Sequence, residues 1–599
     1  MKKTKSIILL TVVLALFVLS FSVFASDNQE EGFSCQKDSF FPDQGNCGYE
    51  AAHYNLDLAW DEPTDILTGY VGIVVNSLWD TSEITFDFSS TYTVSSVKVD
   101  GMPVDFKSEN DNLVVSGNFK QNKSYQIEIN YSGHPQNGNF LMTDEQRAAL
   151  AGKPFCNLAE PNAASNIFPC NNTTKDKASF SIKLTVPSKY IPASNGTLVE
   201  IIQADGTSLI PDDKTLADYK PTGDKVTWRY EEKEAMAPYL FVFCMDEFKA
   251  SLHTEEDGLL ETNFISKNIE DQKAAEQVIG LQEDIKKCFE SATGTAYPFS
   301  AYGATLYGNV LGGALETQSR PVYDPSESAE FVFAHEIAHQ WIGDQVSIAD
   351  WSDLWIKEGW ASYGQALWER CAGRPEGYTK TMEDFYTSLV NNGLSKYSAT
   401  DLVNGMSGSM ADQMKAASLT ADQVVEGVNL LCGKGLDQTK LKADAESALV
   451  DGKADGMTLL NLVPKYCETI IYSTKKGNDF KRLLGMEVSD SNEEPKIHGP
   501  KQIGNTRPEM YNNGPYAGGA MVYYVLNQKL GDEKFTEAMQ LVLKRYGGKT
   551  ITTEEIISCF SEIAGEDLTD FIHPWLYYEP HVPDMPNGPT YAEARYPED

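Results

Sequence analysis

The segment His-Glu-Ile-Ala-His at positions 335–339 constrains the fold of this chain more than any other feature. Residues four positions apart lie on one face of an α-helix, so His335 and His339 can bind one metal ion if this segment is helical. Imidazoles at this spacing suit Zn²⁺, and Glu336 between them can reach a metal-bound water. A shuffled chain of this composition would contain the pattern roughly 0.008 times, which favours a metal site over a core helix with hydrogen-bonded histidines.

The residues before the motif support a helix. Asp324 can cap a helix N-terminus, Pro325 is favoured in a first turn, and Glu327 lies near the third position. From Ala329 to Trp341 the chain contains neither glycine nor proline. We therefore predict a helix that begins at about Asp324 and continues through the motif.

A third metal ligand is predicted at Glu358, which follows His339 after eighteen residues. A second helix around Glu358 would bring its carboxylate back to the first helix. Two histidines and one glutamate leave a fourth position for water, which is the catalytic rather than the structural arrangement of zinc. The sequence thus predicts one Zn²⁺ ion held by His335, His339 and Glu358, with Glu336 as the general base that activates the water.

Composition and charge exclude some functions. The chain has 599 residues, 41% of them hydrophobic, and a formal net charge of −37, as expected of a folded, acidic protein. A nucleic-acid-binding protein would need a basic face, so nucleic acid is excluded as a partner. The same charge disfavours adhesion to anionic membranes but is compatible with a cationic substrate.

The N-terminal residues resemble a targeting segment. Lys2, Lys3 and Lys5 precede an apolar run from Ile7 to Phe24, and short side chains lead to Ala25. We expect a signal peptide over residues 1–25, cleaved near Ala25, and a secreted or extracytoplasmic mature protein. The alternative is an uncleaved N-terminal membrane anchor, and only then would the membrane be a partner.

Sequence periodicity divides the rest of the chain. A polar lead-in at 26–45 precedes 46–250, where alternating apolar residues predict an antiparallel β-sandwich-like domain. Residues 251–395 have helical spacing with a few strands and carry the zinc motif, so they are assigned to the first part of a mainly helical catalytic domain. Residues 396–505 are predicted to be a helical insertion, and 506–599 to complete the catalytic domain. The alternating apolar sets are Tyr54, Leu56, Leu58 and Trp60; Tyr125, Ile127, Ile129 and Tyr131; and Phe180, Ile182, Leu184 and Val186.

An exported chain with ten cysteines can form disulfides. Two pairs that are close in sequence could each close a short loop, Cys35 with Cys47 and Cys156 with Cys170. For five others, buried free thiols are an equal alternative. These are Cys288, Cys371, Cys432, Cys467 and Cys559.

Beyond the zinc motif, the chain resembles the zinc aminopeptidase family that includes membrane alanyl aminopeptidase and leukotriene hydrolase. The segment Gly-Ala-Leu-Glu-Thr at 313–317 is similar to the family's Gly-Ala-Met-Glu-Asn, and 160–162 and 515–520 match further segments. The chain departs from the family at Leu315, Thr317 and Gly518, and Lys357 stands where asparagine usually precedes the third ligand. The resemblance covers most of the chain outside 396–505, and it implies that the catalytic domain is a thermolysin-like, mainly helical α+β domain.

This resemblance implies further site residues. Tyr516 would donate a hydrogen bond to the oxyanion, and Glu160 and Glu316 would bind the α-ammonium of a peptide substrate with a free N-terminus. Gly312, Gly313 and Ala314 would lie beside the substrate backbone, although the glycines could also form a simple turn.

The function expected from these observations is a secreted zinc metallo-aminopeptidase that removes N-terminal residues from peptides through a zinc-bound water. Two alternatives use the same core, a zinc endopeptidase and an epoxide hydrolase. A third is a non-catalytic binding module. The presence of both Glu336 and Tyr516 argues against the binding module, because a non-catalytic protein would not need both.

Overall fold

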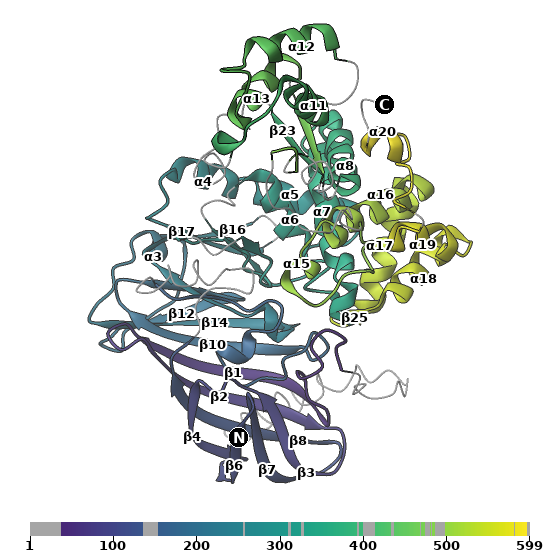
Figure 1. The fold of residues 1–599 in the computed structure, drawn as a ribbon. Coiled ribbons are helices and arrows are strands. Elements are labelled where there is room, and N and C mark those ends of the chain that lie inside the picture. The colour runs from purple at the N-terminus through teal and green to yellow at the C-terminus, as the bar shows by residue number, and fades with distance from the viewer. Residues whose placement is uncertain are drawn as a thin grey trace, which may run out of the picture.

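A computed structural model gives the structure of the protein. It describes residues 37–135, 154–255, 258–309, 313–324, 329–391, 394–398, 414–432, 436–467, 469–473, 480, 482–484, 497–579 and 581–595. A β-rich region occupies one end of the molecule, a mainly helical region packs beside it, and a small helical unit projects from the helical region (Figure 1). The predicted signal peptide lies outside the described residues.

A nine-stranded sheet forms the base of the N-terminal region. The three alternating apolar sets lie in β1, β8 and β10, and except for the half-buried Tyr125 their side chains are buried. The β1–β10 pair is parallel and the other neighbours are antiparallel. In spatial order the strands are β13 (Ser208–Leu209), β12 (Thr197–Ile202), β14 (Lys225–Met236), β10 (Ala178–Pro187), β1 (Tyr49–Asp61), β2 (Ile66–Ser77), β8 (Lys123–Gly133), β4 (Tyr92–Val99) and β5 (Met102–Pro103).

Two smaller sheets complete this region. Phe86 and Val115 come from one of them and are buried in the same core as the large sheet, so the predicted β-sandwich-like N-terminal domain is confirmed. One sheet has the order β3 (Thr81–Asp87), β7 (Asn112–Phe119), β6 (Phe106–Glu109), and the other β11 (Ile191–Ser194), β15 (Val242–Asp246), β9 (Cys156–Leu158). Short helix α3 (Asp213–Ala217) follows β13.

The helical region begins with a mixed sheet. Its edge strand β20 (Ala314–Leu315) pairs antiparallel with β21 (Val322–Tyr323), which places the predicted substrate-binding segment at the rim of the sheet. Helices α4 (Gln272–Ile279) and α5 (Gln282–Thr293) follow β16 (Phe248–Thr254) and β17 (Leu260–Ser266) in the chain. The remaining strands are β18 (Ala301–Tyr302) and β19 (Thr305–Leu306).

The zinc motif lies on α6 (Glu330–Ala338), and the predicted second helix is α7 (Trp355–Cys371). The predicted helix start was wrong. Helix α6 is capped by Ala329, without a side-chain hydrogen bond, and Asp324 is instead buried where its Oδ2 accepts a hydrogen bond from the Gly313 backbone N–H at 3.1 Å. Asp324 therefore holds the β20 loop rather than the helix. His339 follows α6 directly, and its N–H still donates to the His335 carbonyl.

Two glycines let α7 pack against α16 (Gly519–Leu530). A Cβ on Gly359 would lie 2.5 Å from the carbonyl carbon of Gly519, and a Cβ on Gly519 would lie 2.7 Å from the Cα of Gly359. Side chains at either position would push the helices apart. Because Glu358 precedes one glycine and Tyr516 lies just before the other, this crossing sets their relative position.

Most of the remaining helices cover α7 and α16 on the side away from the large sheet, whereas α15 lies on the side toward the β region (Figure 1). Helix α18 has a capping box, in which Thr552 accepts from the Glu555 N–H and Glu555 accepts from the Thr552 N–H. These helices are α8 (Pro375–Val390), α15 (Arg507–Met510), α17 (Asp532–Tyr546), α18 (Thr553–Ala564), α19 (Thr569–Tyr577) and α20 (Tyr591–Arg595), with the short strand β25 (Thr550–Ile551) pairing β22 (Ser347–Ile348).

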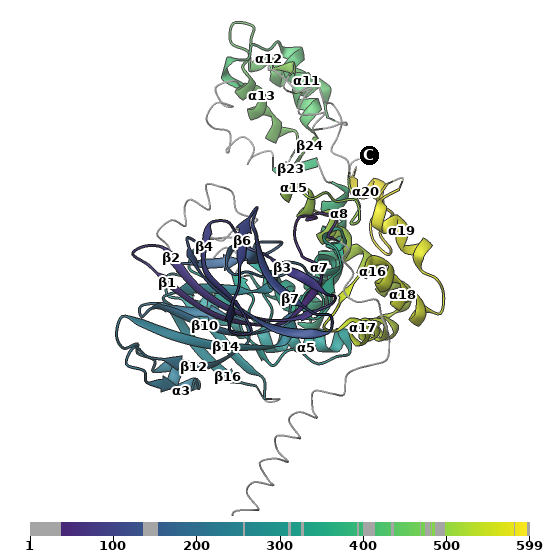
Figure 2. The same ribbon diagram turned by 90° about the horizontal axis from the view of Figure 1, so that it is seen from below.

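Part of the predicted insertion forms a separate helical unit. Helices α11 (Ala421–Cys432), α12 (Gln438–Ser447) and α13 (Gly456–Leu462) bury their own apolar core, which is distinct from the main core. Figures 1 and 2 both show these helices projecting away from the β sheets, with the antiparallel pair β23 (Leu394–Ser398) and β24 (Thr469–Ser473) at their base. The bounds 396–505 stay a prediction.

The disulfides differ from the sequence prediction. Cys156 bonds to Cys244 rather than to Cys170, because β9 and β15 pair these two residues directly across the sheet. Cys170 is a buried free thiol, as is Cys559. Cys47 is disulfide-bonded, but the predicted partner Cys35 lies outside the described residues. Two further bonds join Cys288 to Cys371 and Cys432 to Cys467.

Within the described residues, no helix is both long enough and apolar enough to cross a bilayer.

Replacement of Gly359 by alanine should destabilise the fold by about 1–3 kcal/mol, because the new methyl group meets backbone that cannot rotate away. The measurement is the free energy of unfolding, together with zinc affinity, which should fall because Glu358 is displaced. Gly377→Ala on α8 is the matched control, since there a Cβ meets only the end of the Glu369 side chain and the change should stay within about 1 kcal/mol. Equal stability of the two variants would contradict the role given to the helix crossing.

Candidate zinc active site

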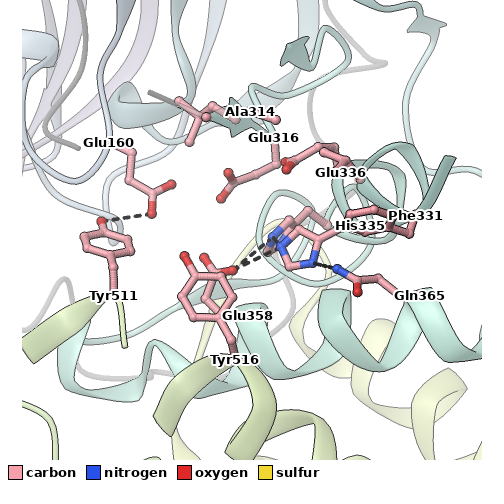
Figure 3. A pocket seen from close by; sticks show the side chains of 14 residues that line it. Glu160, Ala314, Glu316, Phe331, His335, Glu336, Glu358, Gln365, Tyr511 and Tyr516 are labelled. Atoms are coloured by element: carbon pink, nitrogen blue, oxygen red, sulfur yellow. Dashed lines mark hydrogen bonds and ion pairs between the residues drawn. The ribbon is translucent and has the colours of Figure 1, made fainter. Parts of the chain in front are cut away.

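A cavity of about 270 Å³ lies where the two regions meet the C-terminal helices. Figure 3 shows its side chains converging from four parts of the chain: a turn after β9, the β20 loop, the helix pair α6–α7, and the segment before α16. It is lined by Glu160, Gly313, Ala314, Leu315, Glu316, Phe331, Val332, His335, Glu336, His339, Glu358, Gln365, Tyr511 and Tyr516. The predicted Gly312 lies outside the described residues.

Three of these side chains form a compact triangle of ligand atoms. Nε2 of His335 lies 3.2 Å from Nε2 of His339, and Oε2 of Glu358 lies 3.3 Å and 3.5 Å from those two nitrogens. Ligands placed tetrahedrally at zinc distances of about 2.0–2.1 Å are separated by about 3.3 Å. The three buried groups therefore fit Zn²⁺ and leave a fourth direction open to the cavity.

Other groups orient the histidines for metal binding. Nδ1 of His339 lies 3.3 Å from the Ile342 carbonyl, so an N–H at Nδ1 can donate there and leave Nε2 free as a ligand. The amide of Gln365 lies 3.1 Å from Nδ1 of His335, and its oxygen can accept the corresponding N–H. Gln365 was not predicted. It lies seven residues after Glu358 on α7, so helical spacing could have revealed it.

Lys357 is the buried centre of a carboxylate cluster. Its Nζ lies 2.8 Å from Oε1 of Glu160, 2.6 Å from Oε1 of Glu316 and 2.8 Å from Oε1 of Glu358. Burial alone would lower the pKa of Lys357, but the three carboxylates outweigh it and raise that pKa well above its usual value. The sequence identified Lys357 only as a departure from the family pattern, since spacing alone does not show which acids it meets.

Glu336 lies beside the triangle rather than within it. A carboxylate oxygen of Glu336, one of Glu316 and a ring nitrogen of His339 all lie within 4.8 Å of one another. Burial raises the pKa of Glu336 well above its usual value, and the negative charges of Glu316 and Glu358 add to the effect. A carboxylate whose proton affinity has been increased in this way suits proton transfer.

The β20 loop presents Glu316 to the cavity. Gln340, directly after the second histidine, donates from Nε2 to the Glu316 carbonyl at 3.1 Å and so fixes the loop to the zinc motif. Gly313 has a φ of 146°, a backbone conformation that side-chain-bearing residues rarely adopt. This backbone conformation is enough to explain why position 313 is a glycine. Ala314 lines the cavity beside it (Figure 3).

Glu160 enters the same cavity from the N-terminal region. It is 6% exposed, and Tyr511 donates a hydrogen bond from its hydroxyl to Oε1 of Glu160 at 3.1 Å. Because Lys357 contacts both Glu160 and Glu316, these two predicted carboxylates are held around one point although they come from different domains.

Tyr516 lies across the cavity from Glu316 (Figure 3). It belongs to a π-helical turn, η5 (Gly514–Gly518), a local geometry that is frequent at functional sites. Its ring stacks near His335 with centroids 6.0 Å apart. Burial, and after it the charge of Glu358, raise the pKa of Tyr516 well above its usual value, so its hydroxyl stays protonated and can donate.

A metallopeptidase is the class of protein that this fold and this site define. The Peptidase M1 N-terminal domain model matches residues 50–240, and the Peptidase family M1 domain model matches 315–419 and 465–575. The chain belongs to peptidase family M1. The family model passes over 420–464, which includes α11, α12 and α13.

Curated relatives include aminopeptidase N of Canis lupus familiaris, 27% identical over 255 residues, which cover 39% of this chain and 23% of that protein. Glutamyl aminopeptidase of Rattus norvegicus is 24% identical over 356 residues, which cover 53% of this chain and 35% of the relative. The chain thus spans about a quarter to a third of the length of these two relatives.

Solved structures share the fold. An M1 zinc metallopeptidase of Deinococcus radiodurans, a mutant bound to a Tyr-Ser-Ala substrate, has a TM-score of 0.62 at 18% identity, with 90% of this chain and 98% of that chain covered. Without the substrate, the same mutant gives a TM-score of 0.61 over 92% of this chain and 100% of that one, again at 18% identity. These likenesses confirm the fold of a β-rich domain followed by a helical catalytic domain.

Replacement of Gln365 by leucine should weaken zinc binding about 10–100-fold, because Nδ1 of His335 loses its hydrogen-bond partner. A competition titration with a zinc-binding dye measures the affinity. Gln365→Glu keeps an acceptor at the same place and is the control, with affinity expected to be retained. Unchanged affinity in Gln365→Leu would show that this contact does not orient the ligand.

Proposed function

We propose that this protein is a zinc aminopeptidase that hydrolyses the N-terminal residue from peptides. The observation that carries the proposal is the placement of two carboxylates, Glu160 and Glu316, in the same cavity as a zinc-sized triangle of ligand atoms. An enzyme of this kind must hold an α-ammonium at a fixed distance from the metal, and carboxylates are its natural partners.

We assign the metal to His335, His339 and Glu358, whose ligand atoms are spaced for Zn²⁺. Zn²⁺ bound there would polarise the scissile carbonyl and lower the pKa of a water molecule. Glu336 then takes a proton from the attacking water and delivers it to the leaving nitrogen. Its position beside the triangle supports this role, since it is close to the ligand atoms without being one of the three.

Tyr516 supplies a hydrogen bond to the oxyanion that forms when water adds to the carbonyl. Its hydroxyl is protonated, it lines the cavity, and its ring lies beside His335. A donor in place before the reaction stabilises developing negative charge without reorganisation. The π-helical turn at Gly514–Gly518 supports this placement, because it precedes the close crossing of α16 and α7.

Glu160 and Glu316 bind the substrate's α-ammonium, and Ala314 and Gly313 lie beside its backbone. Charge-assisted hydrogen bonds to two carboxylates would align the first peptide bond with the metal. The substrates proposed are therefore peptides with a free N-terminus.

We further propose that the protein is exported, with a signal peptide cleaved near Ala25. The disulfides Cys156–Cys244, Cys288–Cys371 and Cys432–Cys467 support an oxidising compartment, where such bonds form and persist.

Hydrolysis of aminoacyl chromogenic amides tests the proposed function. Activity should be lost on treatment with a chelator and return with stoichiometric zinc. Glu336→Gln should lower kcat by about 10²–10⁴ while binding zinc as the native protein does, because it loses only the proton-transfer group. Bound zinc with no hydrolysis by the native protein would instead favour a binding module.

Tyr516→Phe should lower kcat by about 10²–10³ and change KM little, because the hydroxyl acts on the transition state rather than on the bound substrate. Steady-state kinetics on the same amide measure both constants. Tyr70→Phe on β2 is the control, since this tyrosine belongs to the N-terminal sheet and should leave both constants unchanged. A rise in KM alone would assign Tyr516 to substrate binding.

A further inference from the structure

The buried ammonium of Lys357 lies behind the carboxylates of the cavity. Glu160, Glu316 and Glu358 line the cavity, whereas the Lys357 side chain is 0% exposed and does not. An ammonium has three N–H donors, and each of these carboxylates lies within 2.6–2.8 Å of Nζ. Lys357 thus has one acceptor for each donor in the protein without substrate.

A lysine ammonium and the α-ammonium of a peptide are the same kind of group, with one positive charge and three donors. The two carboxylates assigned to the substrate therefore already hold a cation of the substrate's chemistry. Glu160 contacts it with both oxygens, at 2.8 Å and 3.0 Å, and Glu316 with Oε1. Oε2 of Glu316 accepts no hydrogen bond from the part of the chain that the structure describes, and stays available to a substrate.

This arrangement changes the basis of selectivity for a free N-terminus. Buried carboxylates that depend on the substrate for a partner reject a blocked N-terminus strongly, because they are left unpaired. Here Lys357 keeps Glu160 and Glu316 paired whether or not an α-ammonium is present. Lys357 also places a positive charge directly behind these carboxylates, which weakens their attraction for a second cation.

We propose that Lys357 is a positioning residue that weakens the site's preference for a free N-terminus: its ammonium, held between Glu160 and Glu316 behind the cavity, keeps both carboxylates paired, so that N-acylated peptides are hydrolysed as a secondary substrate class beside peptides with a free N-terminus. The inference rests on the proposed peptidase function and names the substrate class of the same site. Lys357 also contacts the proposed metal ligand Glu358. Oε1 of Glu358 lies against the Lys357 ammonium, while its Oε2 belongs to the ligand triangle.

The first test uses the native protein, loaded with zinc. It compares kcat/KM for an aminoacyl chromogenic amide and for the N-acetylated form of the same amide. We expect the free form to be preferred by less than about 100-fold, whereas unpaired carboxylates would give about 10⁴-fold or more. A ratio of 10⁴ or above overturns this inference and leaves the proposed function intact. Hydrolysis of neither form, with zinc bound, overturns both.

The second test removes the charge. In Lys357→Gln the amide can still donate to the carboxylates, and the preference for the free form should rise at least about tenfold through a lower KM for that form alone. The control is Lys286→Gln, which removes a buried lysine paired with Glu255 and Glu261 outside the cavity and should leave the ratio unchanged. Zinc content and melting temperature are measured for both variants.

An unchanged ratio in a folded, zinc-loaded Lys357→Gln protein overturns the inference, since it would make Lys357 a purely structural cation. Where this variant does not fold, the ratio of the native protein decides.

Discussion

The site depends on gathering carboxylates in a small buried volume. Glu160, Glu316, Glu336 and Glu358 all line one cavity and are nearly inaccessible to solvent, so their mutual repulsion opposes the folded state. Lys357 supplies one compensating positive charge, and a Zn²⁺ ion bound at the ligand triangle would supply two more. Loss of a partner from a buried ion pair costs about 3–5 kcal/mol, so this compensation is large compared with the net stability of a domain.

The same charges connect the parts of the molecule. Glu160 comes from the N-terminal β region, Glu316 from the loop directly after edge strand β20, and Glu358 from α7, yet all contact the Nζ of Lys357. Tyr511 adds a contact from the segment before α16. The active-site cavity therefore exists only when the domains are docked, and the proposed ammonium-binding pair is shared between them. A change in docking would alter the proposed α-ammonium site and the proposed metal ligand Glu358 together.

Much of the site followed from spacing along the chain. Two histidines four residues apart on a helix must share a face, and a glutamate on the next helix can complete a metal site. The sequence alone was therefore enough to propose His335, His339 and Glu358 as one set of ligands. Alternating apolar residues likewise located β1, β8 and β10. The disulfide of Cys156 was not predicted, because its partner lies 88 residues away in the sequence. The pairing of two strands, and not proximity in sequence, brings the two cysteines together.

Local sequence by itself determined the helix pair that carries the proposed zinc ligands and the strand pattern, because both follow from the fixed geometry of helices and strands. The resemblance to a known family added Glu160, Glu316 and Tyr516 as candidates. Only the tertiary structure decided that the side chain of Lys357 turns inward to three glutamates and that Asp324 holds a loop instead of capping a helix. Such contacts join residues up to 197 positions apart. Their partners are set by the packing of domains, helices and loops, which no local pattern encodes.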